Sequence, residues 1–335
     1  MNTHGSGDLA QTLMLRRLGG GLRQTVARTG GEIASGQHTD TARALGGNLM
    51  QLASVEQGLV QAARHSSSAK FGATLLAAQQ NALEQISQIT NSLAPDLRMT
   101  MQATSPDAIS AAGERARAGF EDAIGLLNMK VAGRHIFAGV AGDQRPFAEP
   151  QAILDALASG LPTAPSPSDI TSHVASWFAT GGPFDSLGYL GHSAPNGAID
   201  LGDGNSIRLD VTGADQGLRE SLAALALGAL IAPLTTQMQP SDRRALLAAG
   251  SDAMIASTDS RIATQARIGT QEARAANALA RAEAKAAAFQ IIRTELREAD
   301  PYERATALEA ATQKLDALYL VTARLSRLSL TEYLR

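Results

Sequence analysis

The stretch that most constrains the fold lies between Pro240 and Pro301. Residues 241–298 contain no proline and only two glycines, Gly250 and Gly269. Such a stretch predicts one continuous helix, about 85 Å long at a rise of 1.5 Å per residue. No single globular core needs a helix of that length. The sequence therefore favours long helices packed side by side over a compact globule.

The composition of the chain points the same way. Aromatic residues make up only 4% of the 335 residues, Trp177 is the single tryptophan, and alanine is very abundant. Alanine and leucine form the seams between packed helices. The predicted fold class is mainly α: an elongated antiparallel helical rod or coiled coil with a small β-containing inserted domain.

The N-terminal helix is predicted over residues 12–34. A run of three glycines, residues 19–21, lies inside it, and each glycine costs about 1 kcal/mol relative to alanine. We therefore expect this helix to be weak alone, to need a partner, and to end at Ser35-Gly36. Its apolar stripe follows helical steps of three, four, four and seven, at Leu15, Leu18, Leu22, Val26 and Ile33.

The C-terminal helix, predicted over 301–328, has the cleanest heptad pattern in the chain. Because both terminal stripes are narrow, we expect the two ends of the chain to meet, and burying each leucine in such a seam is worth roughly 1.5–3 kcal/mol. Tyr333 and Leu334 extend beyond the last heptad and are predicted to contact another subunit. The stripe consists of Leu308, Ala311, Leu315, Leu318, Thr322 and Leu325.

The first long helical stretch is predicted from Ala42 to about Met101, with a kink or break at Pro95. Ser105 and Pro106 predict the start of a second helix, which would run to about Val131.

Residues 134–137 are β-prone and are predicted as a strand or hairpin arm. Apolar alternation around Gly-Asp-Gly-Asn predicts a hairpin over 198–211. The apolar run 222–234 is predicted to be a buried helix.

These patterns divide the chain into three predicted domains. Residues 1–41 and 301–335 would form terminal coiled-coil helices, and residues 42–147 and 212–300 a helical rod with a β elbow. Residues 148–211, rich in proline and glycine at the start, would form a small inserted β-rich domain.

Several function classes are disfavoured by the sequence. A net charge of −3 argues against nucleic-acid binding, and the chain has no cysteine for disulfides or thiolate metal sites. The six histidines are scattered, and the Asp200–Asp210 stretch lacks the calcium-loop spacing. Neither a secretory signal nor a membrane span is expected. No catalytic motif is recognisable, so we expect no enzyme activity, no cofactor and no metal.

Four stretches of the chain resemble one protein family. The terminal pieces LRQTVARTGGEIASG (22–36) and ALYLVTARLSRLSLTEYL (317–334) resemble the paired terminal helices of bacterial flagellins and hook-associated proteins. The elbow GRHIFAGVAGDQRPF (133–147) resembles the Gly-Arg-Tyr-Leu-Phe-Ala-Gly signature of hook-associated protein 3, the hook-filament junction family. GYLGH (188–192) is similar to that family's next landmark. Segment 37–48 departs from the family pattern.

The resemblance implies a flagellin-like structural subunit that joins the flagellar hook to the filament. It implies a ring of identical subunits, seated on the first hook-associated junction protein, that templates flagellin polymerisation. It also implies an export chaperone, export through the flagellar secretion system without a cleaved signal, and an extracellular location on the flagellum.

The candidate subunit-contact residues follow from the seams and the elbow. Phe137 and Phe147 either fill a small local core or contact a neighbouring subunit, and Arg134 belongs to the same elbow. The terminal candidates are Leu18, Leu22, Val26, Ile33, Leu315, Leu318, Leu325, Leu328, Tyr333 and Leu334.

Two alternatives stay open at the level of the sequence. The chain resembles flagellins in its termini, although flagellins lack the Gly-Arg-x-x-Phe-Ala-Gly run. A cytoplasmic coiled-coil adaptor would share the long helices without any flagellar role.

Overall fold

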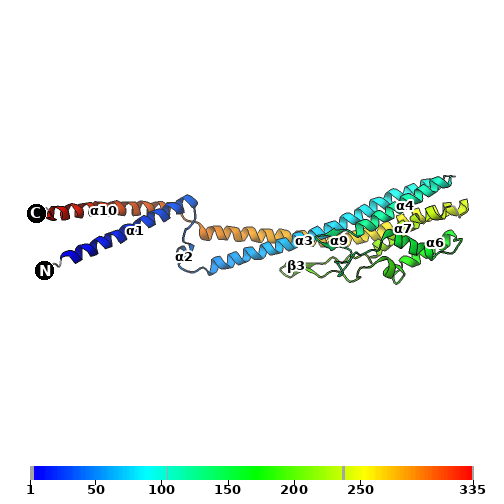
Figure 1. Ribbon diagram of the computed structural model, residues 1–335, viewed down its shortest axis with the longest axis horizontal. Helices are drawn as coiled ribbons and strands as arrows, with labels where there is room; N and C mark the ends of the chain where they lie inside the picture. The colour runs from blue at the N-terminus through cyan, green and yellow to red at the C-terminus, as the bar shows by residue number, and fades with distance from the viewer. Residues whose placement is uncertain (1–3, 104, 236–237, 334–335) are drawn as a thin grey trace. The chain divides into compact units, whose positions relative to one another are not determined.

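A computed structural model describes residues 4–103, 105–235 and 238–333 of the chain, and most of these residues are helical (Figure 1). The prediction of a mainly α fold with a small β part is confirmed. The helices of the first half are α1 His4–Ser35, α2 Thr41–Ala44, α3 Met50–Thr100, α4 Pro106–Leu127, α5 Pro150–Ser159 and α6 Pro167–Phe178. Those of the second half are the π-helical turn η1 Phe184–Gly188, α7 Gln216–Ala229, α8 Ile231–Leu234, α9 Pro240–Arg297 and α10 Pro301–Tyr333.

Two antiparallel strand pairs complete the described secondary structure. β1 (Lys130–Val131) pairs with β2 (Arg134–His135), and β3 (Ile199–Gly202) pairs with β4 (Asn205–Ile207). The second pair confirms the predicted hairpin, with Ile199 opposite Ile207. Ile207 packs closely on α3, because a Cβ added at Gly72 would lie only 2.3 Å from its Cδ1.

The chain divides into two compact units, which are described separately. The first unit comprises Met1–Ala62 and Ala284–Arg335, and the second comprises Ala63–Glu283. The boundaries between these units fall inside α3 and α9. The sequence does not predict such boundaries, because helix breaks do not reveal where a long helix changes its packing partners. The predicted division at residues 41, 147, 211 and 300 therefore stays a prediction.

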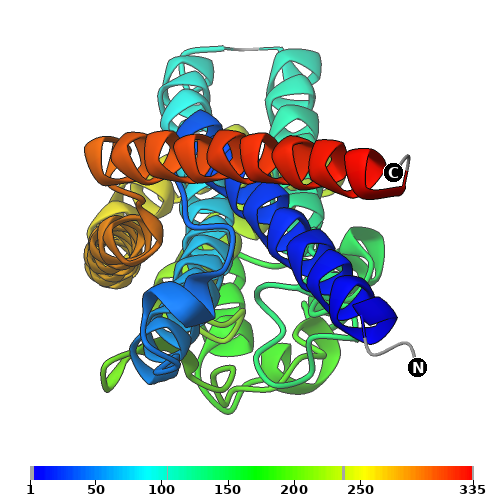
Figure 2. The same cartoon turned by 90° about the vertical axis from the view of Figure 1, so that its left-hand side faces the viewer.

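In the first unit, α1 and α10 lie against each other, as predicted. They meet where Ser35 and Pro301 lie and separate toward the chain ends (Figures 1 and 2). Backbone hydrogen bonds fasten the junction: His38 N donates to Arg297 O at 2.8 Å, and Ala299 N donates to Gly36 O at 3.0 Å.

The helix predicted from Ala42 is interrupted. α2 ends after one turn, and α3 begins only at Met50. Gly46 and Gly47 adopt φ values of 63° and 85°, a left-handed conformation that glycine tolerates and that ends a helix.

Of the predicted kink or break at Pro95, the break is wrong, because Pro95 lies inside α3; the kink stays a prediction. The helix continues to Thr100, although proline removes one backbone hydrogen bond. Pro95 and Asn91, whose carbonyl loses its donor, are both exposed, so water can solvate that carbonyl. The adjacent Leu93 and Leu97 are buried in the core of the second unit and hold the helix in place.

The predicted continuous helix over 241–298 is confirmed by α9, Pro240–Arg297, at 58 residues.

In the second unit, α3 and α4 lie side by side (Figure 2), and an added Cβ at Gly119 of α4 would lie 2.7 Å from Leu93 of α3. α7 fills the core beside them. By length and hydropathy Gln216–Leu234 could cross a membrane, but 78% of that window is buried in the protein, which confirms the predicted buried helix.

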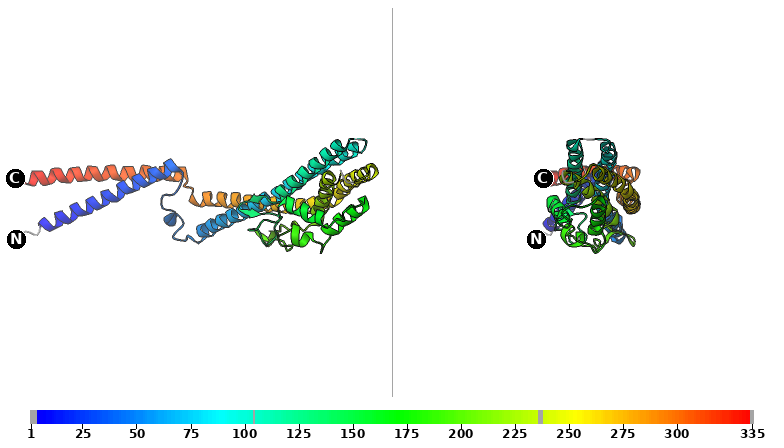
Figure 3. Two further views of the ribbon diagram at one scale, coloured as in Figure 1. Left: turned by 45° about the vertical axis from the view of Figure 1, so that its right-hand side comes forward. Right: turned by 90° about the vertical axis from the view of Figure 1, so that its right-hand side faces the viewer.

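The β-rich character expected over 148–211 is found only at its C-terminal end. Residues 150–178 form α5 and α6 instead, which lie with β3 and β4 on one side of α3 and α4 (Figure 3). Prolines that indicate a loop in the sequence are first-turn residues here: Pro150 starts α5 and Pro167 starts α6. Ser166 and Asp169 form a capping box at α6.

Candidate assembly surfaces

The seam between α1 and α10 uses a regular heptad spacing in α1. Its members are spaced four, three, four and three residues apart and are buried or half-buried: Leu15, Gly19, Leu22, Val26 and Thr29. On α10, Ala311 is buried, and Leu315 and Leu318 are half-buried. Four of the predicted contact residues, Leu22, Val26, Leu315 and Leu318, therefore line the seam inside the subunit.

Gly19 of α1 lies opposite Leu318 of α10 in this seam. A Cβ added there would lie 3.3 Å from Leu318 Cδ2, so glycine lets the leucine reach the α1 backbone. Glu32 closes the seam at the junction end, where it is 3% exposed and its Oε2 lies 3.5 Å from Arg304 Nη1.

Leu18 and Ile33 do not lie in the seam, contrary to the predicted stripe. Their exposed fractions are 48% and 38%, because Gly19 and Glu32, one position away, occupy the buried places. Their side chains face outward and are free to meet another protein. Their role as subunit contacts stays a prediction.

The outward faces of the terminal pair carry many large apolar side chains. Contiguous exposed apolar surface usually marks an interaction site, and a pair of single helices has no second layer to cover it. The exposed residues are Leu13, Met14 and Leu18 on α1 and Tyr302, Tyr319, Leu320, Val321 and Leu325 on α10. Leu328 and Tyr333 lie within α10, but their side chains, like all of Leu334, are outside the described residues.

The elbow, residues 133–147, packs into the core of the second unit. Phe137 and Phe147 are both 0% exposed, so they fill a local core and their rings are not available to a neighbouring subunit. Phe147 packs on Tyr189 with ring centroids 5.5 Å apart. Its backbone exchanges hydrogen bonds with the side chain of Asn128, which turns the chain and ends α4 four residues before Val131.

Gln79 of α3 ties the elbow to the core. Its amide nitrogen donates to Ile136 O at 2.9 Å and to Val211 O at 3.0 Å. The hydroxyl of Tyr189 lies 3.0 Å from Phe137 O, and burial raises the pKa of that hydroxyl. Gln79 and Tyr189, which is 52 residues from Phe137 in the chain, thus hold the elbow in place. The periodicity of the sequence did not predict either contact.

Gly139 of the elbow is required by both conformation and space. Its φ is 61°, and an added Cβ would lie 2.1 Å from His192 O. His192 N in turn donates to Ala138 O at 2.9 Å. The Phe-Ala-Gly run and the GYLGH segment therefore pack backbone against backbone.

The exposed side chains of this region are different from those predicted, except for Arg134. Arg134 is exposed and reaches Asn196 Oδ1 at 3.4 Å. Val140, Leu187 and Leu190 are about half exposed, at 51%, 53% and 48%. Each lies within three residues of a buried aromatic residue, and only the packing distinguishes the exposed side chains from the buried ones.

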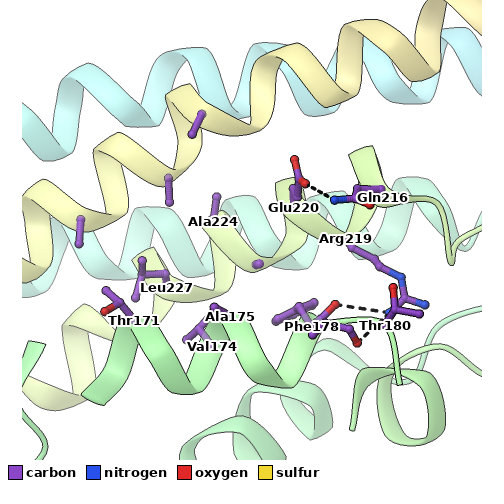
Figure 4. A pocket seen from close by; sticks show the side chains of 15 residues that line it. Thr171, Val174, Ala175, Phe178, Thr180, Gln216, Arg219, Glu220, Ala224 and Leu227 are labelled. Carbon is purple, nitrogen blue, oxygen red and sulfur yellow. Dashed lines mark hydrogen bonds between the residues drawn. The ribbon is translucent and has the colours of Figure 1, made fainter. Parts of the chain in front are cut away.

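A groove of about 630 Å³ runs between α6, α7 and α9. Its walls are mostly apolar, with Val174 and Phe178 from α6 and Leu227 from α7 (Figure 4), and α9 contributes alanines. The polar groups at one end are paired: Arg219 binds Asp185, and Glu220 accepts from Gln216 and Ser260. No nucleophile paired with a base lines this groove among the described residues.

Among the described residues, His, Asp and Glu form no group of three or more that could hold a metal ion.

The fold and surfaces define a class of mainly helical protein whose terminal helices pair and leave apolar faces uncovered. A similar fold occurs in a solved structure described as a "putative flagellar hook-associated protein from Vibrio parahaemolyticus". The TM-score is 0.50 at 12% sequence identity, and the match covers 73% of this chain and 96% of that chain. At this identity the likeness shows the fold. No protein-family model matches this chain, and a search of curated proteins finds no match.

Proposed function

We propose that this protein is a structural subunit of the bacterial flagellum, of the hook-associated kind, that joins hook to filament. The observation that carries the proposal is the uncovered apolar surface of the α1–α10 pair. A helix pair with Met14, Leu18, Leu320 and Val321 exposed gains stability when identical neighbours bury those side chains, each worth roughly 1.5–3 kcal/mol.

Two further observations support the flagellar assignment. The fold is similar to that of a protein described as flagellar and hook-associated. The Gly-Arg-x-x-Phe-Ala-Gly run forms an elbow whose glycine packs on the backbone of the GYLGH segment. This pairing gives a physical reason for both motifs to occur in one chain.

In the proposed assembly, identical subunits form a ring at the distal end of the hook. The ring contacts the first hook-associated junction protein on one side and templates flagellin on the other. The subunit leaves the cell through the flagellar secretion system with the help of an export chaperone. Its role is mechanical, with no enzyme activity.

Electron microscopy of a deletion strain tests the junction role. We expect bare hooks and secreted, unpolymerised flagellin, with filaments restored by the intact gene. Normal filaments in the deletion strain would refute the junction role. Hooks that keep their junction proteins but secrete no flagellin would identify the chain as flagellin itself.

Cell fractionation separates both flagellar roles from an adaptor inside the cell. We expect the protein in flagella sheared from the cells. Recovery in the cytoplasm alone, with intact filaments outside, would support the adaptor instead.

A further inference from the structure

A polar cavity of about 310 Å³ lies in the first unit, beside the junction of α1 and α10. Arg28 and Glu32 reach it from α1, Arg43 from α2, and Arg304 from α10. The connecting segment after α1 contributes His38 and Asp40. This segment belongs to residues 37–48, which depart from the flagellar pattern.

The carboxylates of the cavity already have donors within the protein. Glu32 Oε1 accepts from Thr39 N at 3.1 Å, and its Oε2 faces Arg304 at 3.5 Å. Asp40 accepts from Arg43 N at 3.0 Å as the cap of α2. Glu303 accepts from Arg304 Nη2 at 2.6 Å. These carboxylates are therefore engaged in holding the walls together.

The guanidinium groups are less well matched. In the described part of the chain, no carboxylate pairs with the guanidinium of Arg28 or of Arg43. The Nε atoms of Arg28 and Arg304 are buried without a hydrogen-bond partner, and leaving such a donor unpaired costs about 1–3 kcal/mol. Of the carboxylate oxygens, Glu32 Oε2 has only the longer contact with Arg304. The formal charges of the lining residues balance, and of their buried polar atoms without a hydrogen-bond partner two are donors and one is an acceptor.

We propose that this cavity binds a small oxyanion, a phosphate or a carboxylate, between Arg28 and Arg43. Planar guanidinium groups bind two oxygens of such an anion at once. Arg304 already pairs with Glu32 and Glu303, so Arg28 and Arg43 are the arginines left to hold the anion. The anion would link α1 to the connecting segment and fasten that segment against the helix pair.

This inference is independent of the flagellar role, because it concerns the isolated subunit. Titration of the dilute full-length protein with inorganic phosphate, and separately with acetate, is followed by calorimetry in a buffer free of both anions. We expect saturable binding of at least one anion. Hydrogen exchange at residues 28–44 should slow on binding.

Matched variants locate the site. Arg28→Gln with Arg43→Gln should weaken binding about tenfold or more, because charge-assisted hydrogen bonds to both arginines are lost. Arg17→Gln removes one positive charge, as Arg43→Gln alone does, from an exposed position of α1 and should leave binding unchanged. Arg43→Gln alone, at an exposed position of α2, should weaken binding even if the Arg28 variant folds poorly.

Two results would overturn the proposal. One is the absence of saturable binding for both anions. The other is an equal loss of affinity in Arg17→Gln and Arg43→Gln, which would mean that the anion senses only net charge.

Discussion

At the scale of single residues, Arg261 is the least expected feature of the second unit. It is fully buried, yet within the described part of the chain its hydrogen-bond acceptors are hydroxyl groups rather than carboxylates. Nε donates to Ser87 Oγ at 3.1 Å, and Nη1 donates to Ser221 Oγ at 3.1 Å and Ser257 Oγ at 3.2 Å. Burial lowers the pKa of this guanidinium. The side chain thus joins α3, α7 and α9 at considerable desolvation cost.

Replacement of Arg261 should separate the effect of its volume from the effect of its charge. Arg261→Ala leaves a cavity and should lower the free energy of unfolding by about 2–5 kcal/mol. Arg261→Met fills most of the space and should cost less than about 1.5 kcal/mol, or stabilise the protein. The serines tolerate the loss because Ser221 and Ser257 already donate to carbonyls of their own helices.

Urea unfolding followed by circular dichroism measures these changes. Arg281→Ala, at an exposed position of the same helix, is the control and should shift the unfolding free energy little. If Arg261→Met proves as destabilising as Arg261→Ala, the charge itself is required for stability.

At the scale of elements, the glycines at residues 19–21 predict a weak α1, and they differ in what surrounds them. An added Cβ at Gly19 would lie 3.3 Å from Leu318 Cδ2, a tight contact, whereas an added Cβ at Gly20 or Gly21 would meet nothing within 4 Å. Two of the three glycines therefore lower the stability of the helix without serving any described contact. A marginal helix of this kind gains most from a neighbour that covers it.

Gly20→Ala combined with Gly21→Ala should stabilise α1 in the isolated subunit by about 1 kcal/mol per substitution. Hydrogen exchange of the amides that follow, residues 22–30, measures the gain as slower exchange. Gly19→Ala is the comparison, and it should gain less because its Cβ crowds Leu318. Unchanged exchange in the double variant would show that the glycines do not limit the stability of this helix.

The elements that the sequence predicted well are those with a repeated signal. The absence of proline over 241–298 predicted α9, and strict alternation around Gly202 and Gly204 predicted β3 and β4. The heptad leucines of α10 predicted that it pairs with α1. In each case many residues carry the same information, so a single exception does not mislead.

The details that the sequence could not supply depend on single residues and distant contacts. Leu18 is apolar and helically spaced, yet Gly19 takes the buried place, where an added Cβ would lie 3.3 Å from Leu318. Phe137 is compatible with either a core or an interface until Gln79 and Tyr189 are placed around its carbonyl. Pro150 and Pro167 start helices rather than loops, because proline suits the first helical turn.

At the scale of the whole molecule, the buried cluster of the second unit is built from residues between Ala69 and Ala278. None of its members lies in the described parts of α1 or α10. Assembly and folding can therefore be separated by truncation, since the proposed contact surface and this core lie in different parts of the chain.

Deletion of residues 325–335 should abolish incorporation into flagella while the second unit stays folded. The truncated subunit loses Leu325 and the end of α10, but none of the buried cluster. Limited proteolysis checks folding through a resistant fragment that spans residues 63–283, and immunodetection in sheared flagella checks incorporation. A truncated subunit that still supports filament growth would contradict the proposed role of the C-terminal helix.

The aromatic packing around Phe184 has a practical consequence for spectroscopy. Trp177, the single tryptophan of the chain, lies in that cluster with its ring centroid 4.8 Å from Phe178 and 5.9 Å from Phe184. Its intrinsic fluorescence therefore reports the unfolding of the second unit and does not report the unfolding of the paired terminal helices. Emission and helical ellipticity, recorded on one sample during unfolding, should separate if the terminal helices melt before the rest.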